Sequence, residues 1–237
     1  MIYPKIPVLL YHSINIEKYK NHIDIIDFEK QISYLNKNKY NSTFIKNIKP
    51  DVKKQFIITF DDGYKEVVTY VLPILKKYNF KAICFIVSNQ IGKNNIWDKN
   101  QENFKEKELM GKDDINEWLE NGMLIGSHSH NHYDLTKLNN NELKYEINYS
   151  KDYLEQKFST QILDFCYPFG KINENVYMQV KKNYNNAYTT NRSRYFFNQH
   201  NPLLIPRIDM GKKLSNLKIF FKLQTIYEDI KFLKNEI

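Results

Sequence analysis

The sequence predicts an α/β fold, namely a distorted (β/α) barrel of about seven parallel strands with a C-terminal helix. Short apolar runs alternate with longer amphipathic stretches, as parallel strands alternate with crossover helices. The length of 237 residues is close to the roughly 250 residues typical of such a barrel. No internal repeat or low-complexity linker divides the chain, so a single domain spanning residues 1–237 is expected.

The predicted strands are short runs rich in apolar, β-branched and aromatic residues. In chain order they are Pro7–Tyr11, Phe56–Phe60, Ala82–Val87, Met123–Gly126, Ile162–Tyr167, Asn186–Thr189 and Leu203–Ile208. Polar, chemically reactive residues follow four of these runs directly. Because the carboxyl ends of parallel strands meet at one face of the fold, these residues are expected to converge there.

The predicted helices lie between the strands and carry apolar residues at helical spacing, as Phe28, Ile32 and Leu35 do. They are Phe28–Asn38, Lys65–Tyr78, Asp113–Asn121, Asn140–Phe158, Glu174–Asn183 and Leu214–Leu233. The polar stretch Gly92–Lys107 is predicted to be an excursion loop. The last helix has a broad apolar stripe with lysines between, which fits either a helix packed on the barrel or a basic helix at an anionic membrane surface.

Composition limits the partners and the location. Hydrophobic residues make up 42% of the chain, enough for a sizeable core. The net charge is +8, but the lysines are scattered without an arginine-rich or aromatic-interleaved stripe, so no nucleic acid partner is predicted. Neither a transmembrane segment nor a signal peptide is apparent, so a cytoplasmic location is expected, with the inner membrane face as an option. The sequence leaves the oligomeric state open.

The two cysteines, Cys84 and Cys166, each lie in an apolar, strand-like run. Buried, reduced thiols are the interpretation that this placement favours. A metal-binding role is not expected, because neither cysteine has a ligand partner at the spacing of a zinc site.

Two polar clusters at strand ends have the composition of a metal-hydrolase site. Asp61 and Asp62 follow one predicted strand, and His128, His130 and His132 follow another. A hydrolytic zinc site needs about three protein ligands and an open position for water. A helical turn would pair His128 with His132, the preferred arrangement, whereas an extended segment would pair His128 with His130. One of the adjacent aspartates would bind the ion, and the other would face the water.

Three motifs in order resemble the polysaccharide deacetylases of the NodB-homology type, carbohydrate esterase family 4. They are Thr59–Gly63 (TFDDG), Ile125–Leu135 (IGSHSHNHYDL) and Tyr167–Gly170 (YPFG). The resemblance extends from about residue 6 to residue 210. It implies a distorted (β/α) barrel and metal-dependent removal of an acetyl group, usually N-linked, from a sugar.

By matching positions, the resemblance implies that Asp62, His128 and His132 bind a divalent metal, with Zn²⁺ as the default. Asp61 would be the general base. The segment Pro168–Gly170 would contact the substrate and hold the oxyanion, mainly through the backbone N–H of Phe169, where the family usually has Tyr.

This chain departs from the family pattern at two points, and its ends supply replacements. The arginine of the third motif is missing, and no late Leu-x-His motif provides an acid; His200 lies in an Asn/Gln-rich loop. The opening Ile6–Ile14 and the closing Leu204–Asp209 resemble the subgroup that deacetylates poly-N-acetylglucosamine. That resemblance implies His12 as the general acid and Arg207 as the residue that orients Asp61. The alternatives are a core histidine at position 12 and a purely structural ion pair at Arg207.

The expected function is therefore metal-dependent removal of N-acetyl groups from an N-acetylated glycan or glycoconjugate. Two alternatives remain open: an amidohydrolase acting on a small cytosolic substrate on the same fold, and a non-catalytic glycan-binding relative. The sequence does not name the sugar, its linkage or the native metal.

Overall fold

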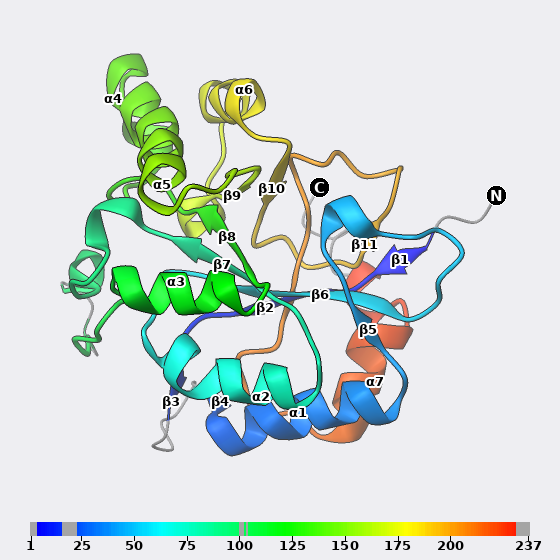
Figure 1. Ribbon diagram of the computed structural model, residues 1–237. Coiled ribbons are helices and arrows are strands. Elements are labelled where there is room, and N and C mark those ends of the chain that lie inside the picture. The colour runs from blue at the N-terminus through cyan, green and yellow to red at the C-terminus, as the bar shows by residue number, and fades with distance from the viewer. Residues whose placement is uncertain (1–3, 16–22, 100–101, 103, 231–237) are drawn as a thin grey trace.

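The computed structural model describes residues 4–15, 23–99, 102 and 104–230. Its central feature is a sheet of parallel strands that curls into a half-barrel with helices around it (Figure 1). This architecture confirms the predicted fold class. The order of the strands is β10 (Asn186–Tyr188), β9 (Asp164–Cys166), β8 (Leu124–Ser127), β7 (Ile83–Ile86), β6 (Gln55–Phe60), β2 (Val8–Tyr11) and β12 (Ile208–Asp209).

Short strands outside this order complete the described β structure. β5 (Asn41–Ser42) pairs in parallel with β6. β1 (Lys5–Ile6) pairs antiparallel with β11 (Tyr195–Phe196), and β3 (Ile14–Asn15) pairs in parallel with β4 (Ile23–Asp24).

The predicted strand Leu203–Ile208 is wrong for most of its length, because this segment changes partner. Ile205 donates its N–H to Ala187 of β10, at 2.8 Å. Three residues later, Ile208 pairs with Leu9 of β2. Pro206, between them, has no N–H to continue a ladder. The segment therefore bridges the two edges of the half-barrel instead of extending one of them.

Side chains alternate along the strands and divide into two apolar clusters. The larger cluster lies between the sheet and the helices and includes Leu9, Ile58 and Cys84. The smaller cluster lies on the opposite face of the sheet and includes Val8, Ile57, Ile83, Phe85, Cys166, Tyr188 and Ile205. Both cysteines are free and buried, one in each cluster, as expected for reduced thiols.

The first five predicted helices are present with small shifts. The observed helices are α1 (Ile25–Lys37), α2 (Leu72–Lys77), α3 (Lys112–Glu120), α4 (Asn140–Lys144), α5 (Ser150–Phe158) and α6 (Glu174–Asn183). α1 begins earlier than predicted because the Asp24 side chain caps it by accepting the N–H of Asp27, at 2.7 Å. The π-helical turns Val67–Val71 and Tyr145–Tyr149 precede α2 and α5.

The predicted helix Leu214–Leu233 is interrupted. α7 covers Asn216–Gln224 and ends at Thr225, whose backbone is extended. The Thr225 hydroxyl accepts the N–H of Tyr227, at 3.2 Å, which favours a new helical start there. Ile219 and Leu223 pack into the core. Leu233 lies outside the described residues, and within those residues no helix has the length and apolarity to cross a membrane.

Candidate active site

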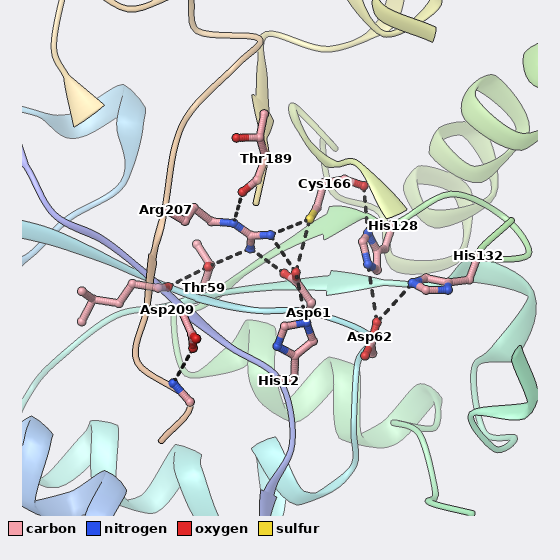
Figure 2. A network of polar contacts seen from close by, with 12 residues as sticks. His12, Thr59, Asp61, Asp62, His128, His132, Cys166, Thr189, Arg207 and Asp209 are labelled. Atoms are coloured by element: carbon pink, nitrogen blue, oxygen red, sulfur yellow. Dashed lines mark hydrogen bonds and ion pairs between the residues drawn. The ribbon is translucent and has the colours of Figure 1, made fainter. Parts of the chain in front are cut away.

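The predicted site residues come together at the carboxyl ends of the parallel strands (Figure 2). Asp61 and Asp62 directly follow β6, and His12 directly follows β2. His128 directly follows β8. Arg207 comes from the segment that bridges the sheet edges, immediately before β12. Three strand ends and the bridging segment therefore supply one constellation.

Asp62, His128 and His132 form one buried cluster. The Asp62 Oδ1 atom lies 3.5 Å from His128 Nε2 and 3.4 Å from His132 Nε2. One candidate ligand atom from each residue lies within 4.8 Å of the others. Asp62 has a left-handed backbone with φ of 74°, and Gly63 follows with φ of 76°. This turn directs the Asp62 carboxylate away from that of Asp61, so the two aspartates face different neighbours.

The two histidines do not share a helical turn, so the helical argument for pairing them is wrong. The segment after β8 is an irregular loop in which Ser129 and His132 are left-handed, with φ of 63° and 60°. The Ser129 hydroxyl accepts the N–H of His132, at 3.0 Å, across this turn. The loop conformation, rather than helical periodicity, brings His128 and His132 to the same carboxylate.

The loop is held from outside by a buried glutamate. Glu146, in the π-helical turn before α5, accepts the backbone N–H groups of His130 and Asn131, at 3.0 and 2.8 Å. His130 points away from Asp62, and its Nδ1 is hydrogen-bonded to Ser88 Oγ, at 2.8 Å. His130 is therefore part of the loop's support rather than of the Asp62 cluster.

The chemistry of the cluster fits a divalent metal ion. His128 Nδ1 lies 2.8 Å from the Cys166 carbonyl oxygen, which can only accept, so Nδ1 donates and leaves the Nε2 lone pair toward Asp62. Burial and the neighbouring His128 lower the pKa of His132 to about 3, which keeps its imidazole neutral. One carboxylate and two imidazoles are a donor set suited to Zn²⁺ and to other divalent transition metals.

Without a metal, the cluster holds a proton. Burial alone would lower the pKa of His128, but the adjacent Cys166 and Asp62 side chains raise it well above its usual range. We attribute this direction mainly to Asp62, because burial also raises the pKa of the Cys166 thiol and keeps it uncharged. A metal ion would have to displace this proton.

Asp61 is bound to Arg207 inside the barrel. The Arg207 Nη1 and Nη2 atoms donate to the two Asp61 oxygens, each at 2.7 Å. The other guanidinium hydrogens are directed to Thr59 Oγ1, the Thr189 carbonyl and Cys166 Sγ. Burial alone would raise the pKa of Asp61, but the Arg207 charge outweighs it and holds this pKa well below its usual range. Asp61 is therefore ionised at neutral pH.

Cys166 lies within the site, where the sequence predicted only a buried, reduced thiol without a metal-binding role. Its Sγ is 3.2 Å from Arg207 Nη2 and 3.5 Å from Asp61 Oδ2. With Asp61 and His128 it forms a second group of potential ligand atoms. Because Arg207 already occupies both Asp61 oxygens, this second group is the poorer metal site. The strand alternation that turns Cys166 inward is the signal that could have located it.

His12 lies at the solvent side of Asp61. Its Nε2 is 3.8 Å from Asp61 Oδ2, and its side chain is 52% exposed. It is therefore not a buried core histidine, and its imidazole can meet a bound molecule.

Two aromatic rings contact His132. The ring centroids of Trp97 and Phe169 each lie 4.6 Å from that of His132. Trp97 belongs to the short helical turn Ile96–Asp98, inside the stretch predicted as an excursion loop, and the sequence interpretation assigned it no role. A tryptophan in an otherwise polar insertion was the available signal.

The segment Pro168–Gly170 follows β9 and lies beside the Asp62 cluster through Phe169. Phe169 is left-handed, with φ of 58°, and its ring is half-exposed. Gly170 is required here, because a Cβ atom would lie 2.0 Å from Thr190 Oγ1. This tight turn keeps the Phe169 backbone at the rim of the site.

The comparisons with known proteins agree with this geometry. The polysaccharide deacetylase family model matches residues 48–188. YxkH of Bacillus subtilis (strain 168) is 28% identical over 185 residues, which cover 75% of this chain and 61% of that protein. Poly-beta-1,6-N-acetyl-D-glucosamine N-deacetylase of Staphylococcus aureus (strain MRSA252) is 27% identical over 139 residues, covering 55% of this chain and 45% of the relative. The chain thus spans less than two thirds of each.

Solved structures share the fold. Deacetylase PplD of Streptococcus pyogenes, determined in complex with acetate, matches with a TM-score of 0.81 at 23% identity over 94% of this chain and 99% of that one. IcaB from Ammonifex degensii matches with a TM-score of 0.75 at 17% identity over 87% and 91% of the two chains. The family match covers more than half of the sequence, so the chain belongs to the polysaccharide deacetylase family.

Proposed function

We propose that this chain is a metal-dependent hydrolase that removes N-acetyl groups from an N-acetylated sugar or polysaccharide. The observation that carries the proposal is the position of an ionised carboxylate, Asp61, beside the Asp62, His128 and His132 cluster. A general base must be charged and close to the water that it activates. The ion pair with Arg207 keeps Asp61 ionised. The turn that Asp61 and Asp62 share keeps the Asp61 carboxylate close to the cluster.

Asp62, His128 and His132 are the proposed metal ligands, with Zn²⁺ as the first candidate. A divalent ion in such a site lowers the pKa of water and polarises a carbonyl group. Asp61 accepts the proton of the attacking water. The backbone N–H of Phe169 contributes to holding the oxyanion that develops on the acetyl group.

His12 is proposed as the general acid. An amine leaves poorly unless it is protonated as the C–N bond breaks. The His12 imidazole is half-exposed and within 3.8 Å of Asp61, so it can face the departing nitrogen from the open side. The rings of Trp97 and Phe169 pack against His132, a proposed metal ligand.

The proposed substrate is an N-acetylated glycan or glycoconjugate, and poly-N-acetylglucosamine is the reference polymer because of the Staphylococcus aureus relative. We also propose that the chain acts as one catalytic domain. Peripheral contact with an anionic membrane is compatible with the exposed apolar residues of α7, which include Leu217 and Phe220.

The test is acetate release from chito-oligosaccharides, a nucleotide-linked N-acetyl sugar and a cyclic ureide, each with and without chelator. Asp61→Asn should retain metal but lose at least about a hundredfold in turnover, the usual contribution of general base catalysis. The matched control is Asp164→Asn, a half-buried aspartate that accepts hydrogen bonds from Asn186 and Tyr188, at 3.1 Å each. Its turnover should stay close to that of the wild type.

Each alternative predicts a different result. Chelator-resistant turnover, or full activity of Asp61→Asn, would contradict the proposed mechanism. Hydrolysis of the ureide alone would identify a small-molecule amidohydrolase. Glycan binding without acetate release from any substrate would identify a non-catalytic relative.

A further inference from the structure

Two adjoining cavities extend from the candidate active site to α7. The first has a volume of about 370 Å³ and is lined by His12 and Arg207, which both lie beside Asp61. The second has a volume of about 340 Å³ and lies against Lys218 of α7. The cavities share Arg192, Asp209 and Lys212 in their linings. Because they share these lining residues, the two cavities are taken together and called here the basic groove.

The groove carries a surplus of positive charge. Besides Arg207, which is paired with Asp61, its cations are Arg192, Lys212, Lys218 and Lys222, and its lining has one carboxylate, Asp209. The buried Glu228 offsets two of these cations, since it lies 2.9 Å from Lys222 Nζ and 3.6 Å from Arg192 Nε.

Lys212 and Lys218 differ from the other cations. Both are exposed, and neither forms an ion pair with a carboxylate in the part of the chain that the structure describes. Asp209 forms no ion pair with either lysine within the described residues, and its Oδ1 accepts the N–H of Gly211, at 3.0 Å. The two ammonium groups are therefore available to an anion from outside.

One wall of the groove is aromatic. Phe221 and Tyr227 line the cavity beside α7, and their side chains are 44% and 48% exposed. A flat ring with an apolar face and a polar rim, such as a pyranose, can pack on such a wall. The groove can therefore accommodate an anion at the two lysines together with a sugar ring on the aromatic wall.

We propose, building on the proposed deacetylase function, that the basic groove binds the phosphate group of a phosphate-bearing acetamido sugar whose acetamide lies at Asp61. A phosphate group has several acceptor oxygens and can be shared by two ammonium groups, whereas a neutral sugar offers no counter-charge to Lys212 and Lys218. Lys212, at the proposed phosphate position, and His12, beside Asp61, line the same cavity. This cavity therefore connects the two positions.

The test compares a chito-oligosaccharide that carries a 1-phosphate with the same oligosaccharide without it. For the metal-loaded wild type, kcat/KM should be higher for the phosphorylated substrate. In the double variant Lys212→Glu, Lys218→Glu, the ratio of the two kcat/KM values should fall about tenfold or more, as expected for losing charge-assisted contacts. Since both side chains are exposed and unpaired among described residues, the variant should retain the wild-type melting temperature.

A charge control and a binding measurement complete the design. Lys181→Glu, on α6, changes the charge of an exposed lysine away from the groove and should leave the ratio unchanged. Calorimetric titration with inorganic pyrophosphate should show binding to the wild type that the double variant loses. Co-sedimentation with phosphatidylglycerol vesicles, lost in the double variant, would assign the phosphate to a lipid headgroup instead of a soluble sugar phosphate.

The outcomes separate this inference from the function on which it rests. If the enzyme is active and the ratio of the two kcat/KM values is the same in the wild type and the double variant, phosphate binding in the basic groove is overturned and the deacetylase function stands. No acetate from any substrate, with pyrophosphate binding still dependent on the two lysines, would overturn the deacetylase function and retain the anion site.

Discussion

Replacing Arg207 with methionine should move the pH dependence of activity, because it removes the cation that keeps Asp61 ionised. In the wild type the Arg207 guanidinium holds the pKa of Asp61 well below its usual range. Methionine fills similar space but leaves the Asp61 carboxyl buried without a counter-charge. Burial then raises the pKa of Asp61, by up to about 3–5 units for a fully buried group. At neutral pH the variant should carry a protonated Asp61 that cannot accept a proton from water.

The same substitution should lower stability by an amount that depends on pH. Breaking a buried ion pair by removing one partner costs about 3–5 kcal/mol. For a domain of this size, this corresponds to a fall in Tm of about 6–20 °C. The wild-type carboxyl has a lowered pKa, so its stabilisation is present above the unfolded pKa of about 3.9 and is lost as pH falls through the folded pKa. In the variant the pKa of the Asp61 carboxyl is raised, so the stability of the variant protein falls as pH rises. The Tm difference should therefore widen between pH 4 and 7.

The assay is acetate release from pH 4 to 10, with Tm measured at each pH. The acid limb of kcat/KM should move to higher pH in Arg207→Met, and activity should partly recover in alkaline buffer. The matched control is Arg194→Met, which removes another arginine–aspartate pair: Arg194 Nε donates to Asp229 Oδ1, at 3.1 Å, away from the catalytic cluster. It should lower Tm without moving the acid limb. An unchanged acid limb in Arg207→Met, with Tm loss equal to the control, would refute the reasoning.

Three further predictions concern the metal cluster. Elemental analysis should find that His132→Ala loses bound metal and His130→Ala keeps it; the reverse result would identify His130 as a ligand. Chelator competition should show about 10–100-fold weaker metal binding in Glu146→Gln, which loses the charged acceptor that holds the histidine loop, and wild-type affinity would make Glu146 dispensable. Neighbouring groups outweigh the effect of burial at His128 and raise its pKa, so a metal ion must displace the proton of His128. Metal affinity should therefore increase about tenfold for each pH unit as the pH rises toward that pKa. An affinity that does not change with pH would exclude this displacement.

The sequence predicted the parts of this molecule that local patterns determine. Strands β6 and β7 and helix α6 follow from apolar periodicity within a few residues, and their bounds agree closely with the predicted ranges. The sequence also predicted which face would carry the site, because parallel strands place all their carboxyl ends together. These features need no knowledge of distant contacts.

The pair His128 and His132 was named from the sequence, but the conformations that depend on distant contacts were missed. His128 and His132 meet because Glu146 and Ser129 hold an irregular loop, and no residue spacing encodes that conformation. Trp97 reaches His132 from a polar insertion whose path depends on the rest of the fold. The end of α7 at Thr225 was not predicted, because the apolar stripe of the sequence continues past it. The Thr225 hydroxyl accepts a backbone N–H and so competes with the hydrogen bonds of a continuous helix.

The bridging segment shows why barrel geometry and catalytic chemistry are linked here. Arg207 donates its backbone N–H to the Asn191 carbonyl, at 2.8 Å, and its Nε–H to the Thr189 carbonyl, at 2.9 Å, both in the segment that follows β10. The same residue holds Asp61 at the end of β6, on the other side of the half-barrel. The guanidinium can reach Asp61 only if the segment crosses between the two edges of the half-barrel. Bridging these edges and keeping the proposed general base ionised therefore depend on the same residue. A chain in which this segment detached could keep its metal ligands and still lack an ionised base.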